Sequence, residues 1–160
     1  MLTVTVICIG KLKEKYLSDA CSEYQKRLSA FCKLNVVELA EYKLPDNPSD
    51  AQISGCIQKE GESILGKIAK DACVIPLCIE GKSFSSPELA QKIEGVALGG
   101  CSSIAFVIGG SYGLSDRVKS VGKFSLSMSK MTFPHQVARV MLLEQIYRCF
   151  QILSHGKYHK

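Results

Sequence analysis

The 160-residue sequence lacks any apolar run near the ~18–20 residues that a helix needs to span a bilayer. Its first residues, MLTVTVICIGK, lack the basic segment and the small-residue cleavage site of a signal peptide, and they predict a strand instead. There is also no internal repeat, low-complexity tract or linker. These absences predict a cytoplasmic protein with a single domain over residues 1–160, a length that can enclose a hydrophobic core.

The sequence also lacks a C-x-x-C pair, the spacing that zinc ribbons and thioredoxin-like motifs use. Most cysteines have apolar neighbours, as Cys8 does in VICIG. We therefore predict no metal site and interpret the cysteines as small buried side chains in a reducing compartment. The eight are Cys8, Cys21, Cys32, Cys56, Cys73, Cys78, Cys101 and Cys149.

No strong excess of either charge is present, since 20 Lys and Arg against 15 Asp and Glu leave a formal net charge of +5. This mild excess permits an anionic partner without requiring one. Its placement is more informative, because the last 22 residues contain a single acid, Glu144. The basic residues and histidines of that segment are Arg139, Arg148, His155, Lys157, His159 and Lys160.

Strand and helix patterns alternate along the chain. Apolar, β-branched runs predict strands at 2–9, 34–40, 73–79, 102–108 and 123–129. Helical spacing predicts helices over 13–31, from 49 or 50 to about 68, from an N-cap at Ser86, over 115–121 and over 134–153. This alternation predicts an α/β fold with a largely parallel sheet flanked by helices, in which ligands bind beyond the carboxyl ends of the strands.

Three predicted strand ends carry residues suited to a ligand: LCIEGK at 77–82, IGGSYGL at 108–114 and SMSKMTFPH at 127–135. They offer glycines, aliphatic walls and sulfur, with Lys82 and Lys130 as the nearby cations. A triphosphate needs more positive charge, whereas an adenosine or a thioether needs backbone hydrogen bonds and apolar walls. The pattern indicates a nucleoside site, and a tight turn without a ligand is the alternative.

Two glycine motifs do not meet the requirements of nucleotide-binding loops. The G-G-x-x-G of 109–113 has the wrong spacing and comes too late in the chain for a dinucleotide fold. GESILGKI at 61–68 approaches a phosphate-binding loop, but Ile68 replaces the required Ser or Thr and the segment lies within a helical pattern.

The final predicted helix is apolar over more than half its circumference, which favours a homodimer interface or a helix buried on both sides within one chain. His135, just inside this helix, is either a structural hydrogen-bonding group or a base. The tail GKYHK is either frayed or a surface for a phosphate and a stacked base.

Several motifs together resemble one family, the ribosomal RNA large subunit methyltransferase H family of the SPOUT class. They are IGGSYGL, LSMSKMTFPHQVARVMLLEQIYR and the terminal YHK, with ICIGKLKEKYL, EYQKRL and KEGESIL in the N-terminal half. The resemblance implies transfer of a methyl group from S-adenosylmethionine to N3 of a pseudouridine in large-subunit ribosomal RNA, within the assembled ribosome. It also implies a homodimer and a trefoil knot in the C-terminal half.

The same resemblance implies a cofactor site at the three strand ends. Tyr112 departs from the small polar or acidic residue that is usual at its position in the family. The implied cofactor-binding residues are Leu77, Gly109, Met128, Ser129, Lys130, Met131, Thr132 and Phe133.

An imide nitrogen must lose its proton to accept a methyl group, so a base or a group that stabilises the anion is needed. Tyr158, His159 and Lys160 are our candidates for holding the pseudouridine, with His159 as the proton acceptor. His135 and Arg139 are further catalytic candidates. If the last helix forms the dimer, the tail of one chain reaches the other chain's cofactor site.

Two other functions fit the sequence. The first is a ribosome-associated protein that keeps the nucleoside pocket without catalysis. The second is a methyltransferase of the same fold with another RNA target, such as transfer RNA.

Overall fold

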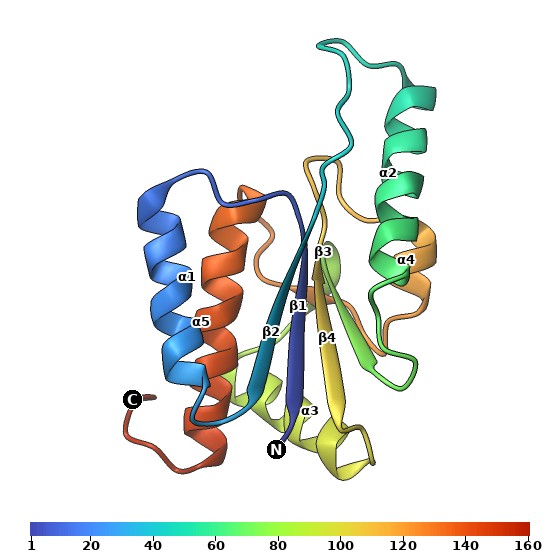
Figure 1. Cartoon of the computed structure of the whole chain (residues 1–160). Coiled ribbons are helices and arrows are strands. Elements are labelled where there is room, and N and C mark those ends of the chain that lie inside the picture. The colour runs from blue at the N-terminus through green and yellow to red at the C-terminus, as the bar shows by residue number, and fades with distance from the viewer.

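Five parallel strands form the centre of the molecule, in the order β2-β1-β4-β3-β5 (Figure 1). The computed structural model describes all 160 residues. The α/β prediction is confirmed, although the fifth strand is much shorter than 123–129 and the third extends four residues further. The strands are β1 (Thr3–Ile9), β2 (Lys33–Leu39), β3 (Cys73–Ser83), β4 (Ser103–Ile108) and β5 (Leu126–Ser127).

Helices cover both faces of this sheet. The helices α1, α3 and α5 lie on one face, and α2 and α4 lie on the other (Figure 1). Alternate residues of β1 face the two sides: Val4 and Val6 join the larger core, and Ile7 joins the smaller one. The helices are α1 (Lys15–Leu28), α2 (Asp50–Leu65), α3 (Ser86–Leu98), α4 (Asp116–Ser120) and α5 (His135–Leu153).

The strand β3 changes its partner half-way along its length. It pairs with β4 from Cys73 to Pro76 and with β5 from Leu77 onward. Proline has no N–H to donate, so it suits the residue at which a ladder ends. The chain after Pro76 therefore diverges from β4, which separates two strand ends that both carry predicted cofactor-binding residues.

The N-cap of α3 differs from our prediction by one residue. Ser85, and not Ser86, accepts the hydrogen bond from the Glu88 N–H, and the Glu88 carboxylate accepts from the Ser85 N–H. Ser86 instead donates its hydroxyl hydrogen to Gln145 Oε1 of α5, at 2.6 Å. Both serines are good capping residues, and the hydrogen bond from Ser86 to α5, which the sequence does not reveal, leaves Ser85 as the N-cap.

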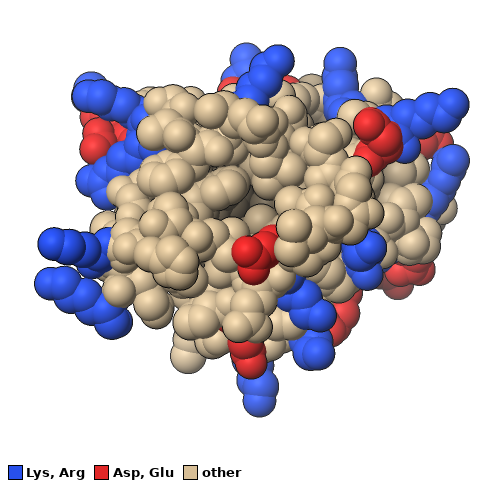
Figure 2. All heavy atoms as spheres, turned by 90° about the horizontal axis from the view of Figure 1, so that it is seen from below, with Lys and Arg blue, Asp and Glu red and all other residues tan.

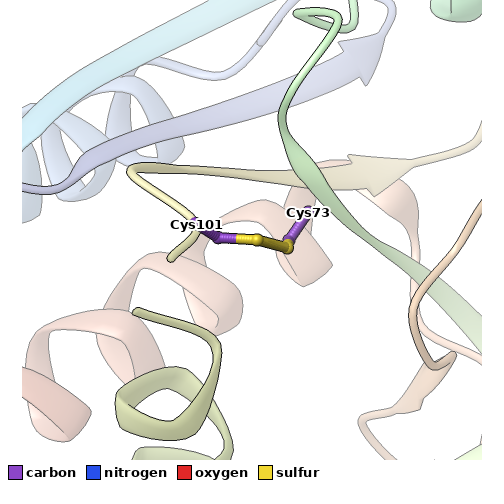
Figure 3. The surroundings of a disulfide bond; sticks show 2 residues. All are labelled: Cys73 and Cys101. Carbon is purple, nitrogen blue, oxygen red and sulfur yellow. A yellow bond between two sulfur atoms is a disulfide. The ribbon is translucent and has the colours of Figure 1, made fainter. Parts of the chain in front are cut away.

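Cys73 and Cys101 form a disulfide (Figure 3), so the prediction of eight reduced cysteines is wrong for this pair. Cys73 begins β3 and Cys101 lies just before the neighbouring parallel strand β4, at the same end of the sheet, and their Cα atoms are 6.3 Å apart. That separation is within the range a disulfide can bridge. The other six cysteines are free and buried, as predicted.

The end of the molecule that carries the N-terminus presents no single basic patch. Figure 2 shows lysines and arginines around its rim, interspersed with acids, while the middle is largely uncharged and hollowed. None of the helices is both long and apolar enough to cross a membrane. Neither sign of charge dominates this face, so a partner that binds here must be recognised by more than net charge.

Candidate functional site

The three predicted strand ends meet around one cleft of about 880 Å³. Its walls come from the second half of β3, the turn after β4 and the segment between β5 and α5. This volume is within the usual range of small-molecule sites. Seven of the eight predicted cofactor-binding residues line it, and Lys130 does not: the seven are Leu77, Gly109, Met128, Ser129, Met131, Thr132 and Phe133.

The turn after β4 requires glycine because the chain folds back on itself. A Cβ atom at Gly109 would lie 2.8 Å from the Gly113 backbone, too close for any side chain. Gly113 has a φ of +83°, a conformation that glycine adopts freely, and its N–H donates to the Gly110 carbonyl. The buried run of β4 therefore ends in a narrow backbone loop that forms one wall of the cleft.

The charged side chains that line the cleft neutralise each other. Lys119 of α4 donates a hydrogen bond to the Glu80 carboxylate on β3, and this bond lowers the Glu80 pKa and raises the Lys119 pKa. Lys82, a cation we considered from the sequence, is not part of the wall. A cleft with apolar walls and no surplus positive charge fits a nucleoside or thioether better than a triphosphate.

Serine hydroxyls shape the wall between β5 and α5. The Ser127 hydroxyl donates to the Ser129 carbonyl at 3.1 Å, and the Met131 N–H donates to Ser129 Oγ at 3.0 Å. These two bonds fold residues 127–131 into a tight turn at the cleft edge. Ser129 therefore contributes to the shape of the wall as well as lining it.

His135 and Arg139 lie one turn apart on α5 but in different surroundings. His135 lines the cleft beside Gly10, whereas Arg139 is 2% exposed. The Arg139 guanidinium donates to Glu38 at 2.7 Å and to the Gly10 carbonyl at 3.0 Å, and its Nε has no partner. Arg139 thus joins α5 to β1 and β2, and it does not line the cleft.

The tail lies at the foot of α5, at the opposite end of the molecule from the glycine turn (Figure 1). The Tyr158 hydroxyl donates to Glu144 at 3.0 Å, and Arg148 lies 3.4 Å from His159 Nδ1. Burial and the Glu144 carboxylate raise the Tyr158 pKa. Tyr158, His159 and the exposed Lys160 do not line the cleft of their own chain.

A family model described as a predicted SPOUT methyltransferase matches residues 2–159. The chain belongs to this SPOUT methyltransferase family. A ribosomal RNA large subunit methyltransferase H of Clostridium novyi (strain NT) is 53% identical over 159 residues, which cover 99% of this chain and 100% of that protein. The protein of the same name in Clostridium botulinum (strain Hall) is 52% identical over the same coverage. A Methanococcus maripaludis (strain C5) protein, which has that name provisionally, is 51% identical, again with the same coverage.

These matches confirm the resemblance that the C-terminal motifs indicated. Sequence reasoning nevertheless missed two charged residues in the SPOUT methyltransferase cleft, Glu80 and Lys119. Glu80 lies within the predicted strand end LCIEGK, but its partner is 39 positions away and only the fold brings them together. No three histidine, cysteine, aspartate or glutamate side chains lie close enough together to hold a metal ion.

Proposed function

We propose that this SPOUT methyltransferase transfers a methyl group from S-adenosylmethionine to N3 of a pseudouridine in large-subunit ribosomal RNA of the assembled ribosome. The observation that carries the proposal is the full-length identity of 51–53% to relatives named for methylation of that RNA. The matched region covers 99% of this chain and so includes the glycine turn and the segment before α5.

The cleft has the properties that S-adenosylmethionine requires. Leu77, Gly109 and Phe133 offer backbone groups and apolar surface for the adenosine, and Met128 adds a polarisable side chain. The cofactor supplies a methyl group on a positively charged sulfur, which is an activated leaving group. The protein's main contribution is therefore to position the acceptor nitrogen in line with that methyl group.

The acceptor nitrogen must lose a proton, and His159 is our candidate for receiving it. In this proposal Tyr158 and Lys160 hold the pseudouridine beside it. The three residues lie away from the cleft of their own chain, so we infer that they act in the cleft of a second copy. The active enzyme is then a homodimer in which each site combines a cleft from one chain and a tail from the other.

A groove along α5 offers the surface for such a dimer. It has a volume of about 480 Å³ and is lined by half-buried apolar side chains that include Val140 and Met141. Leu126 and Met128 line both this groove and the cleft, so the two hollows adjoin. A second copy seated here would approach the cleft.

Complementation between two defective chains tests the shared site, at an S-adenosylmethionine concentration low enough to leave a weakened cleft largely empty. One chain lacks residues 156–160, and the other carries Gly109→Ala. The mixed dimer has one site that combines an intact cleft with an intact tail, so a random mixture should recover roughly a quarter of wild-type activity on ribosomes. An inactive mixture in which mass spectrometry finds mixed dimers would contradict the shared site.

The His159→Ala protein tests the proton acceptor. It should bind S-adenosylmethionine like the wild type but methylate about 100-fold or more slowly. Methylation at the wild-type rate would exclude His159 from that role.

A further inference from the structure

A second hollow adjoins the cofactor cleft across the tip of the glycine turn. Its volume is about 330 Å³, and it lies between the chain after β2, the helix α2 and the turn after β4. Ser111 and Tyr112 line both this hollow and the cofactor cleft, so a single loop tip separates the two. A polymer whose target unit enters the cleft would place a neighbouring unit close to the second hollow.

The polar floor of this hollow is the carboxylate of Glu60. Its residue is only 5% exposed, and Oε2 accepts a hydrogen bond from the Tyr42 N–H at 3.0 Å. The thiol of Cys56 and the backbone of Gly110 lie beside it. An ionised carboxylate has about four acceptor positions, so Glu60 keeps capacity for an N–H donor that enters the hollow.

Exposed aromatic rings, lysines and the acid Glu41, which accepts a hydrogen bond from the Ser111 hydroxyl, surround the opening. Tyr42 is 43% exposed and Tyr112 is 46% exposed, although both are large side chains that could be buried. Lys59 places its ammonium 4.5 Å from the centre of the Tyr42 ring, and Lys43 lines the hollow as well. Aromatic faces for bases, together with cations for phosphates, are typical of single-stranded nucleic-acid sites.

Resting on the function proposed above, we propose that this hollow binds a nucleobase of the RNA next to the target nucleotide. The base stacks on Tyr42 or Tyr112 and donates an N–H to Glu60, with Lys43 and Lys59 near its phosphate. Guanine fits best, because its N1–H and N2–H present two adjacent donors to a carboxylate. Tyr112 then has a role as the wall that divides the target base from its neighbour.

Steady-state methylation of ribosomes by the full-length enzyme tests the subsite, with the ribosome concentration varied at saturating S-adenosylmethionine. Tyr42 is the informative position because its side chain lines only the second hollow. Tyr42→Ala should raise the KM for ribosomes about tenfold, since one base loses its stacking surface, while Tyr42→Phe should stay near wild type. Tyr16→Ala is the matched control, because Tyr16 is an exposed tyrosine that lines neither hollow and should leave KM unchanged.

An unchanged KM for ribosomes in Tyr42→Ala would overturn the subsite. So would a parallel loss of affinity for S-adenosylmethionine, measured by calorimetry, because it would mean that the substitution disturbs the glycine turn.

A titration of the isotope-labelled wild-type protein with GMP separates this proposal from the proposed function. GMP should shift the amide signals of Tyr42, Lys43 and Glu60, which line the second hollow and not the cofactor cleft. If ribosomes are not methylated and these shifts occur, the subsite stands and the proposed function falls. If the shifts are absent, the subsite is overturned, and a raised KM in Tyr42→Ala would then indicate contact with a ribosomal protein.

Discussion

Arg139 illustrates how a residue type can suggest one role while its surroundings dictate another. As a cation in the last helix it is a candidate for stabilising an anion, yet the fold buries it against Glu38 and the Gly10 carbonyl. Arg139→Met should lower the free energy of unfolding by about 3 kcal/mol, because it leaves the partner groups without their ion pair. Urea unfolding measures this loss. If Arg139→Met is as stable as the wild type but no longer methylates ribosomes, Arg139 has a catalytic role instead.

Glu60 should make the stability of the protein depend on pH. Burial raises its pKa above the ordinary 4.5, so the folded chain retains the proton to higher pH than the unfolded chain. The stability associated with the protonated form is present below pH 4.5 and is lost as the pH rises through the folded-state pKa. In Glu60→Gln the side chain is an uncharged amide that does not titrate, and its oxygen can still accept a hydrogen bond from the Tyr42 N–H.

The difference in unfolding free energy between Glu60→Gln and the wild type should therefore shift in favour of the variant as the pH rises from 4 to 7. Urea titrations of both proteins at several pH values measure that difference, and other titrating groups cancel in it. If this difference in unfolding free energy is constant with pH, or moves in favour of the wild type, then ionisation of Glu60 does not destabilise the folded protein.

At the scale of elements, the glycine turn after β4 is the most informative segment. Gly109→Ala places a methyl group 2.8 Å from the Gly113 backbone, so the turn must move. We expect affinity for S-adenosylmethionine to fall about tenfold or more, which calorimetry measures. Gly95→Ala is the control: nothing lies within 4 Å of its Cβ position in α3, and it should stabilise the protein by about 0.5–1 kcal/mol. Unchanged cofactor affinity in Gly109→Ala would place the cofactor elsewhere.

Periodicity predicted most helices and strands because buried faces repeat along each element. It failed where a contact between distant segments decides the outcome. The fifth strand pairs only over Leu126–Ser127, and its register with β3 shifts between Leu77 and Lys82. The Cys73–Cys101 disulfide likewise depends on the order of the strands, which local patterns do not reveal. The trefoil knot stays a prediction of the family resemblance.

At the scale of the whole molecule, the position of the cleft was predictable from the sequence, whereas the side-chain pairings around it were not. Parallel strands place their carboxyl ends at one edge, so Leu77, Gly109 and Met128 had to lie close together. The pairing of Glu80 with Lys119, and the hollow floored by Glu60, arise from side chains far apart in the sequence. The separation of the tail from the cleft is also a property of the fold, and it leads to the proposal of a shared site.

Methyl transfer from radiolabelled S-adenosylmethionine tests the central proposal most directly. The acceptors are 70S ribosomes, free large subunits and bulk transfer RNA, all from cells that lack this gene. We predict label in assembled ribosomes alone, located at a pseudouridine of the large-subunit RNA. Label in transfer RNA would assign this SPOUT methyltransferase another target, and no label in any acceptor, with cofactor binding intact, would contradict the proposed catalysis.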